Sequence, residues 1–336
     1  MRRIGIIGSG EIALIHFEAL RRQGASFTSA FDVNKETLQA FCRETGASPC
    51  ACAEEMIADE SLDTLFICTR HDSHVSLAYD ALRAGKTVFL EKPLALSARE
   101  ALPLFSLPKE QQERLYIGYN MRHTPAMLHL KQVMKERQVQ VESFRANMTG
   151  APFMSGWASD PRLGGGVLVC QGSHMFDLIT STLGSPIASV MADTRHVRLC
   201  EDRMPDMAAL LLRLKNGVTG TLLLHDQGCY AFHVDPGAAM VNLTLYSREG
   251  TYDTDAYGTS CFADVKTFSN FPSADPADRV RAWGYEQQMD LFLNAPDQLC
   301  TLAQAIYVAS CVDAAARSAQ SGQWEDVIEP VPFVDR

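Results

Sequence analysis

A glycine-rich turn near the start of the chain lies between a short apolar run and a segment with helical spacing. The turn, GSGEIA at residues 8–13, follows the run RRIGIIG and leads into the amphipathic segment Ile12–Arg22. In a strand–turn–helix unit of this kind, backbone N–H groups at the start of the helix can bind the pyrophosphate of a dinucleotide. We therefore predict that a dinucleotide contacts this turn through Gly8, Ser9, Gly10, Glu11 and Ile12.

The alternation of apolar runs and helical patterns continues to about residue 120. The runs FTSAFD, DTLFICT and TVFLEKP are separated by the helical patterns Lys35–Thr45 and Val75–Ala84. Strands that alternate with helices of about 10–15 residues indicate βαβ units on a parallel sheet. Residues 1–120 are therefore predicted to form an α/β domain, a Rossmann dinucleotide-binding domain.

Asp32 ends the second apolar run, 24 residues after Gly8. An acidic side chain at that place can accept hydrogen bonds from the ribose hydroxyls of the adenosine, and its charge would repel the 2′-phosphate of NADP. The pattern therefore favours NAD over NADP, although Lys35 nearby softens the contrast. The alternative is a tight turn that only packs a helix on a strand, with Asp32 as a surface cap.

After residue 120 the spacing of the apolar residues changes. Thr124 followed by Pro125 predicts the start of a helix that runs to about Glu136. Strand-like runs follow at Val139–Met148, Ile187–Val197, Met207–Leu214, Val218–His225 and Met240–Tyr246. Asn216-Gly217 separates two of these runs and predicts a β-hairpin.

Helical patterns return near the end of the chain, at Ala282–Asn294 and at Gln298–Ser318, the latter followed by Gly322. Runs of strands followed by helices are typical of an α+β arrangement. We therefore predict a second domain over residues 121–336, an α+β domain with an open, mainly antiparallel sheet that serves substrate binding and oligomerisation.

Charge and cysteine content disfavour several kinds of partner. Thirty Lys and Arg against forty Asp and Glu give a formal charge of −10, which disfavours nucleic acid, and no stretch approaches the about 20 apolar residues that span a membrane. The ten cysteines contain no CxxC pair, and the spacing of His71 and His74 lacks a third ligand nearby. We expect reduced, mostly buried thiols, no metal and a cytoplasmic protein.

Four segments together resemble the Gfo/Idh/MocA family of NAD(P)-dependent oxidoreductases, and the resemblance covers essentially the whole chain. The segments are GSGEIA, AGKTVFLEKPLAL at 84–96, GYNMRHTP at 118–125 and GGGVLVCQGSHMFDL at 164–178. The resemblance implies that the lysine of EKP lies beside the nicotinamide and the substrate hydroxyl, and that the histidine of the last segment is the acid/base group. Carried over to this chain, the catalytic residues are Lys92 and His174.

The chemistry of alcohol oxidation supports these two assignments. When hydride leaves a carbinol carbon, the O–H proton must go to a base, and a desolvated lysine or a neutral imidazole can accept it near pH 7. We expect reversible NAD-dependent oxidation of a secondary alcohol; the resemblance alone implies a small polyhydroxylated substrate, namely a sugar, a sugar derivative or a cyclitol. Two alternatives remain open: a redox-neutral enzyme that retains NAD for elimination or epimerisation, and a non-catalytic NAD-binding regulator.

The resemblance implies further contacts and a partner. It places on the cofactor the residues Thr69, Arg70, His74 and Glu91, together with Lys92 itself. It places on the substrate, besides Lys92 and His174, the residues Asn120, Arg122, Trp157 and Cys170. The alternative for Asn120 and Arg122 is a surface hinge, and the alternative for Trp157 is a packing anchor or part of a subunit contact. It also implies a homodimer or homotetramer built on the C-terminal sheet.

Cys170 departs from the family pattern, which usually has aspartate at this position. If Gly166–Leu183 is helical, Cys170 lies one turn before His174, so the thiol takes the place of the carboxylate that would orient the imidazole. We expect Asp177 to supply part of the lost interaction, and the pKa of His174 to be lower than in relatives. The alternative is that Cys170 is a small buried residue without a chemical role.

Overall fold

The computed structural model describes residues 3–150, 156–226, 240–256, 259–263, 268–272, 275 and 278–330. The first of its two sheets has six parallel strands in the order β3-β2-β1-β4-β5-β6. The strands are β1 (Ile4–Ile7), β2 (Phe27–Phe31), β3 (Ser48–Pro49), β4 (Thr64–Ile67), β5 (Thr87–Leu90) and β6 (Leu115–Ile117). The helices of this part are α1 (Glu11–Arg22), α2 (Lys35–Thr45), α3 (Ala53–Ala58), α4 (His74–Arg83), α5 (Ala98–Phe105) and α6 (Lys109–Gln112). The predicted Rossmann arrangement is confirmed.

The second sheet has nine strands in the order β14-β13-β12-β11-β7-β10-β9-β8-β15, and every neighbouring pair is antiparallel except β7 and β10. The strands are β7 (Val141–Thr149), β8 (Ile187–Arg195), β9 (Met207–Leu214), β10 (Thr219–His225), β11 (Met240–Ser247), β12 (Thr251–Asp255), β13 (Thr259–Ala263), β14 (Phe268–Pro272) and β15 (Glu325–Asp326). The mainly antiparallel sheet is thus confirmed, whereas strands β12 to β14 were not predicted.

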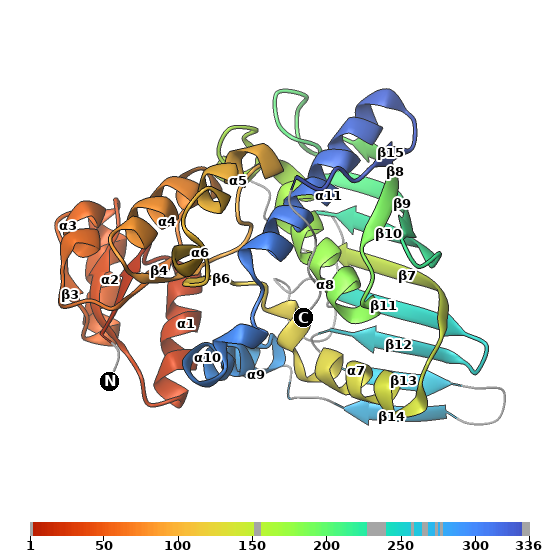
Figure 1. Cartoon of the computed structure of the whole chain (residues 1–336), viewed down its shortest axis with the longest axis horizontal. Coiled ribbons are helices and arrows are strands. Elements are labelled where there is room, and N and C mark those ends of the chain that lie inside the picture. Colours follow the sequence, from red (N-terminus) through yellow and green to blue (C-terminus); the bar gives the residue numbers. More distant parts are fainter. Residues whose placement is uncertain are drawn as a thin grey trace.

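Helices lie between the second sheet and the first domain (Figure 1). They are α7 (Pro125–Arg137), α8 (Ser173–Leu183), α9 (Arg279–Ala282), α10 (Tyr285–Asn294) and α11 (Leu302–Ser321). Helix α11 contacts both α5 and β8, so it joins the two domains. Strands β9 and β10 alternate buried and exposed residues, which leaves the other face of the sheet open.

Local sequence explains several element ends. The Thr124 side chain caps α7 as predicted, and Gly217, with φ +90°, makes the predicted hairpin turn between β9 and β10. The prediction of one helix over Ala282–Asn294 is wrong, because Gly284 has φ +82° and separates α9 from α10. The last helix begins later than predicted, after a capping box formed by Thr301 and Gln304.

The core of the first domain includes residues from the end of the chain. Phe292 of α10 packs edge-on against Phe66 of β4 and Phe89 of β5, with ring centroids 5.3 and 5.4 Å apart. Tyr285 of the same helix packs against the ring of His16 in α1. Helix α10, which belongs to the second domain in sequence, therefore completes the core of the first (Figure 1).

Three observations bear on the cysteines, metals and membranes. The eight cysteines whose side chains are described are free, but only four are buried, namely Cys68, Cys170, Cys300 and Cys311. The side chains of Cys229 and Cys261 lie outside the described part. Within the described residues there is no group of three or more His, Cys, Asp or Glu that could hold a metal ion, and no helix with the length and apolarity to cross a membrane.

Candidate active site

The predicted dinucleotide turn has the geometry that its glycines require. Gly8 has φ +89°, and a Cβ built on it would lie 2.4 Å from the carbonyl oxygen of Cys68, so only glycine fits. Gly10 differs, because a Cβ there would meet no described atom within 4 Å. Gly10 is the N-cap residue of α1, and no described side chain accepts a hydrogen bond from the backbone N–H groups in the first turn of this helix. Uncapped N–H groups facing open space fit the pyrophosphate of NAD.

Asp32 lies beside this turn at the end of β2. Its Oδ2 accepts hydrogen bonds from the backbone N of Ser9 at 2.7 Å and from the Ser9 hydroxyl at 3.2 Å, and its Oδ1 accepts from the backbone N of Asn34 at 2.8 Å. A carboxylate has about four acceptor positions, so these three bonds leave room for a ribose hydroxyl. Of the other predicted contacts at the turn, Glu11 is exposed and Ile12 half-buried.

Glu91 and Lys92 directly follow β5, as predicted for the EKP segment. The buried Glu91 carboxylate accepts a hydrogen bond from the backbone N of Lys92 at 3.1 Å and lies 2.6 Å from Nε2 of His16. His16 was not predicted from the sequence. The signal was present, because His16 falls in the buried stripe of α1 between Ala13 and Leu20, where an apolar residue would be expected.

The loop after β4 contacts the EKP segment through His74. The buried ring has Nδ1 2.7 Å from the carbonyl oxygen of Pro93 and Nε2 3.1 Å from that of Thr69. The Thr69 hydroxyl is also hydrogen-bonded to Ser73, at 2.7 Å. The side chain of Arg70 is largely exposed and lies 3.3 Å from Asp72. The structure therefore brings His74 between the EKP segment and Thr69 and leaves Arg70 at the surface.

Lys92 lies beside the segment that carries Cys170 and His174. Its Nζ is 3.5 Å from the carbonyl oxygen and 3.9 Å from Sγ of Cys170. Burial raises the pKa of the Cys170 thiol, although the Lys92 charge opposes this. Burial, and then the positive charge of Lys92, hold the pKa of His174 well below its usual range. The imidazole is therefore neutral at pH 7, and its buried Nδ1 has no hydrogen-bond partner in the described part of the chain.

The segment Gly166–Leu183 is helical without a break, but it is not α-helical throughout. Residues Leu168–Gly172 form a π-helical turn, and α8 begins only at Ser173. Single π-turns occur frequently at functional sites, because the wider turn redirects side chains. Cys170 lies in this turn and His174 in the first turn of α8.

Asp177 does not replace the missing carboxylate, which corrects the expectation for this residue. Its buried carboxylate accepts two hydrogen bonds from Arg122. Nε of Arg122 donates to Oδ2 at 3.0 Å, and Nη2 donates to Oδ1. Nη1 of Arg122 lies 3.4 Å from the side-chain oxygen of Gln304. The Asn120 amide donates to the carbonyl oxygen of Trp283 at 2.9 Å. Asn120 thus joins the end of the first domain to the second, and Arg122 is paired within the second domain, while the predicted substrate contacts of both stay a prediction.

Trp157 belongs to a loop of the second domain that contacts the first. Its side chain is 39% exposed, and its ring lies edge-on to His71 with centroids 4.9 Å apart. Nδ1 of His71 donates to the carbonyl oxygen of Gly164 at 2.9 Å. Burial holds the pKa of His71 well below its usual range, so this ring is also neutral. His71 was considered in the sequence only as a metal ligand.

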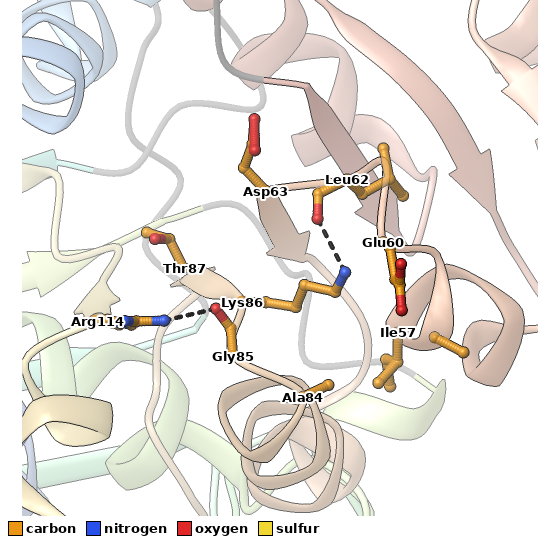
Figure 2. A pocket seen from close by; sticks show the side chains of 10 residues that line it. Ile57, Glu60, Leu62, Asp63, Ala84, Gly85, Lys86, Thr87 and Arg114 are labelled. Atoms are coloured by element: carbon orange, nitrogen blue, oxygen red, sulfur yellow. Dashed lines mark hydrogen bonds between the residues drawn. The ribbon is translucent and has the colours of Figure 1, made fainter.

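A cavity of about 600 Å³ lies away from these residues (Figure 2). Its lining includes Asp63, Lys86 and Arg114, which immediately precede β4, β5 and β6. It therefore opens at the amino ends of the parallel strands, whereas the EKP segment lies at their carboxyl ends. The Lys86 amine donates to the carbonyl oxygens of Asp59 and Leu62 at 2.6 and 2.8 Å, so it has a structural role there.

Comparison with known families agrees with the two-domain arrangement. Residues 2–119 match the oxidoreductase family model described as an NAD-binding Rossmann fold, and residues 128–236 match the GFO/IDH/MocA C-terminal domain. The chain belongs to the Gfo/Idh/MocA family. The family resemblance expected from GSGEIA, EKP and the glycine-rich segment is thereby confirmed, and so is an NAD-binding oxidoreductase.

Individual Gfo/Idh/MocA relatives are similar over much of the chain. The myo-inositol 2-dehydrogenase of Thermotoga maritima is 26% identical over 244 residues, which cover 68% of this chain and 70% of that protein. The 1,5-anhydro-D-fructose reductase of Ensifer adhaerens is 26% identical over 65% of this chain and 67% of its own length. A solved oxidoreductase domain protein from Kribbella flavida, 20% identical, superposes with a TM-score of 0.84 and covers 98% of this chain and 100% of its own.

Proposed function

We propose that the protein reversibly oxidises a secondary alcohol of a sugar, sugar derivative or cyclitol with NAD, using Lys92 to polarise the oxygen and His174 to exchange its proton. The observation that carries the proposal is that Lys92 Nζ lies 3.5 Å from the carbonyl oxygen of Cys170, four residues before His174 in the same helical segment. The Lys92 ammonium lies beside Cys170, in the π-turn just before α8, and its charge lowers the pKa of His174.

The two side chains divide the proton chemistry between them. When bound, NAD would supply the acceptor for the hydride of the carbinol carbon. The neutral His174 takes the O–H proton, and the Lys92 ammonium stabilises the negative charge that this leaves on the oxygen until the C=O bond forms. A histidine whose pKa is held low by burial is deprotonated at neutral pH and is therefore ready to act as a base.

The substrate class rests on the relatives and on the surroundings of Lys92. Two relatives are named for a cyclitol and for an anhydro sugar, both of which carry several hydroxyl groups. Around Lys92 the chain offers groups that can exchange hydrogen bonds with such a substrate, including the imidazoles of His71 and His174. The half-exposed ring of Trp157 beside His71 offers an apolar face on which a sugar ring can stack.

A substrate screen with a matched variant tests the proposal. Sugars, sugar acids, glycosides and inositols are supplied with NAD, and NADH formation is followed by absorbance. We expect at least one polyol to be oxidised, and Lys92→Met to lower kcat by about 10²–10³-fold or more while the NAD dissociation constant stays within a few fold. Substrate conversion without net NADH would instead indicate a redox-neutral reaction, and retained kcat in the variant would remove Lys92 from the mechanism.

The open face of the second sheet supports the oligomer that the resemblance implies. Leu211 of β9, Leu223 of β10 and Tyr246 of β11 are 48%, 40% and 37% exposed on this sheet. Exposed apolar side chains that cluster on a sheet face are typical of subunit contacts. Sedimentation velocity is expected to show a dimer or tetramer, and a monomer at micromolar concentration would contradict this part of the proposal.

A further inference from the structure

His16 and Glu91 form a buried polar pair that has no part in the proposed proton chemistry. His16 is fully buried on α1, and Glu91, 5% exposed, lies 75 residues later at the end of β5. Their Nε2 and Oε1 atoms are 2.6 Å apart. Three aromatic rings surround the imidazole, those of Phe66, Phe89 and Tyr285, with centroids 5.1 to 5.6 Å away. A polar pair in such surroundings is costly unless its hydrogen bond is made.

The Glu91 carboxylate accepts hydrogen bonds through both oxygens. Because a carboxylate only accepts, the imidazole donates through Nε2 to Oε1, while Oε2 accepts from the backbone N of Lys92 at 3.1 Å. The space beside Oε1 is narrow, since a Cβ built on Gly118 would lie 3.1 Å from this oxygen. His16 therefore determines where the carboxylate lies, and the carboxylate determines where the Lys92 backbone lies.

A second buried histidine holds the other side of Lys92. His74 lies 2.7 Å from the carbonyl oxygen of Pro93, the residue after Lys92. The backbone of the lysine is thus fixed on one side by a histidine of α1 and on the other by a histidine of α4. Helix α1 is also the helix whose uncapped N-terminus faces the proposed pyrophosphate site, so one element carries both the cofactor contact and the support of Lys92.

We propose that His16 is a positioning residue for Lys92, acting through Glu91, and that it links the dinucleotide-binding helix to the proposed catalytic lysine. This inference rests on the role given to Lys92 in the proposed function. A displacement of about 1 Å at a catalytic group can cost about a hundredfold in rate. Loss of the His16 hydrogen bond should therefore lower kcat more than it weakens NAD binding.

Two amide variants of similar polarity test the proposal. In His16→Gln the side-chain nitrogen can reach the place of Nε2, whereas in His16→Asn the shorter side chain leaves the nitrogen near the place of Nδ1. We expect His16→Gln to keep kcat within about threefold of the wild type and His16→Asn to lower kcat at least tenfold. For both variants we expect the NAD dissociation constant, measured by fluorescence titration, to stay within about threefold. Phe66→Leu is the packing control, expected to lower stability without lowering kcat.

The outcomes separate the positioning role from a structural role. Equal kcat losses in both amide variants, parallel losses of kcat and NAD affinity, or a folded His16→Asn enzyme with unchanged kcat would overturn the proposal. If His16→Asn does not fold, Glu91→Ala takes its place, because it removes both acceptor oxygens, and the same loss of kcat is expected. Lys92→Met is tested beside these variants. It removes the lysine side chain directly, so a Lys92→Met enzyme with unchanged kcat would contradict the proposed function itself, whatever the His16 variants show.

Discussion

Replacing Cys170 with aspartate should move the pH dependence of the reaction in a direction that the structure specifies. The thiol lies 3.9 Å from the Lys92 ammonium and is buried, so an aspartate there would form an ion pair with Lys92. At present the Lys92 charge adds to burial in lowering the pKa of His174. A carboxylate would neutralise that charge and favour the protonated imidazole. We therefore expect the pKa of His174 to rise in Cys170→Asp.

The size of the shift follows from the spacing. For a carboxylate about 6 Å from the imidazole, two unit charges interact by about 3 kcal/mol at an effective dielectric constant of about 20. That energy corresponds to about 2 pKa units, and sharing the carboxylate with Lys92 reduces the effect on His174 to about 1–2 units. The imidazole must be neutral to accept the proton, so kcat/KM rises with pH as His174 loses its own proton. In Cys170→Asp this rise, the low-pH limb of the profile, should move to higher pH by the same amount.

The assay is a pH profile of kcat/KM for the wild type, Cys170→Asp and Cys170→Ser on an accepted substrate, with an NMR titration of His174 in the same three proteins. Cys170→Ser is the matched control, because it keeps a small neutral group, and it should stay within about threefold of the wild type. If the low-pH limb of kcat/KM in Cys170→Asp stays where it is in the wild type, or moves to lower pH, the electrostatic reasoning is refuted. A hundredfold loss in Cys170→Ser, about 2.7 kcal/mol, would show that the thiol takes part in the chemistry.

Two further predictions concern cofactor choice and stability. NAD should bind more tightly than NADP because the Asp32 carboxylate repels a 2′-phosphate, and a fluorescence titration in which NADP binds equally well would contradict this. Asp177→Asn should lower the free energy of unfolding by about 3–5 kcal/mol, because it leaves the Arg122 charge buried with a neutral partner, and urea unfolding measures the loss. The exposed pair of Asp193 and Arg195 provides the control, since Asp193→Asn should cost less than about 1 kcal/mol. Equal losses in the two variants would show that burial of the pair has no effect.

The elements that sequence predicted correctly depend on local rules. The turn at Gly8, the cap at Thr124 and the hairpin at Gly217 each follow from the conformation that one or two residues adopt. The strands β12 to β14 do not carry a comparably clear alternation, and the π-turn at Leu168–Gly172 has the same apolar spacing as an α-helix. Periodicity alone could therefore identify neither.

The sequence was sufficient to name several residues of the candidate site, but it did not show which of these side chains are hydrogen-bonded to one another. Lys92 could be placed from the EKP segment, but the partner of Glu91 is 75 residues away on α1, and the partner of Asp177 is 55 residues away in the 3₁₀ turn at Met121–His123. From helical spacing Asp177 lies near His174, which suggested the wrong partner. Only the tertiary fold shows that Arg122 takes this carboxylate.

The packing of α10 on the first domain has a consequence for synthesis on the ribosome. The sheet of that domain is complete at Ile117, yet Phe66 and Phe89 are covered by Phe292, which is made more than 160 residues later. At about 5–20 residues per second, the apolar surface stays uncovered for about 10–30 s. During that interval the nascent domain exposes aromatic side chains to which chaperones, or other unfinished chains, can bind.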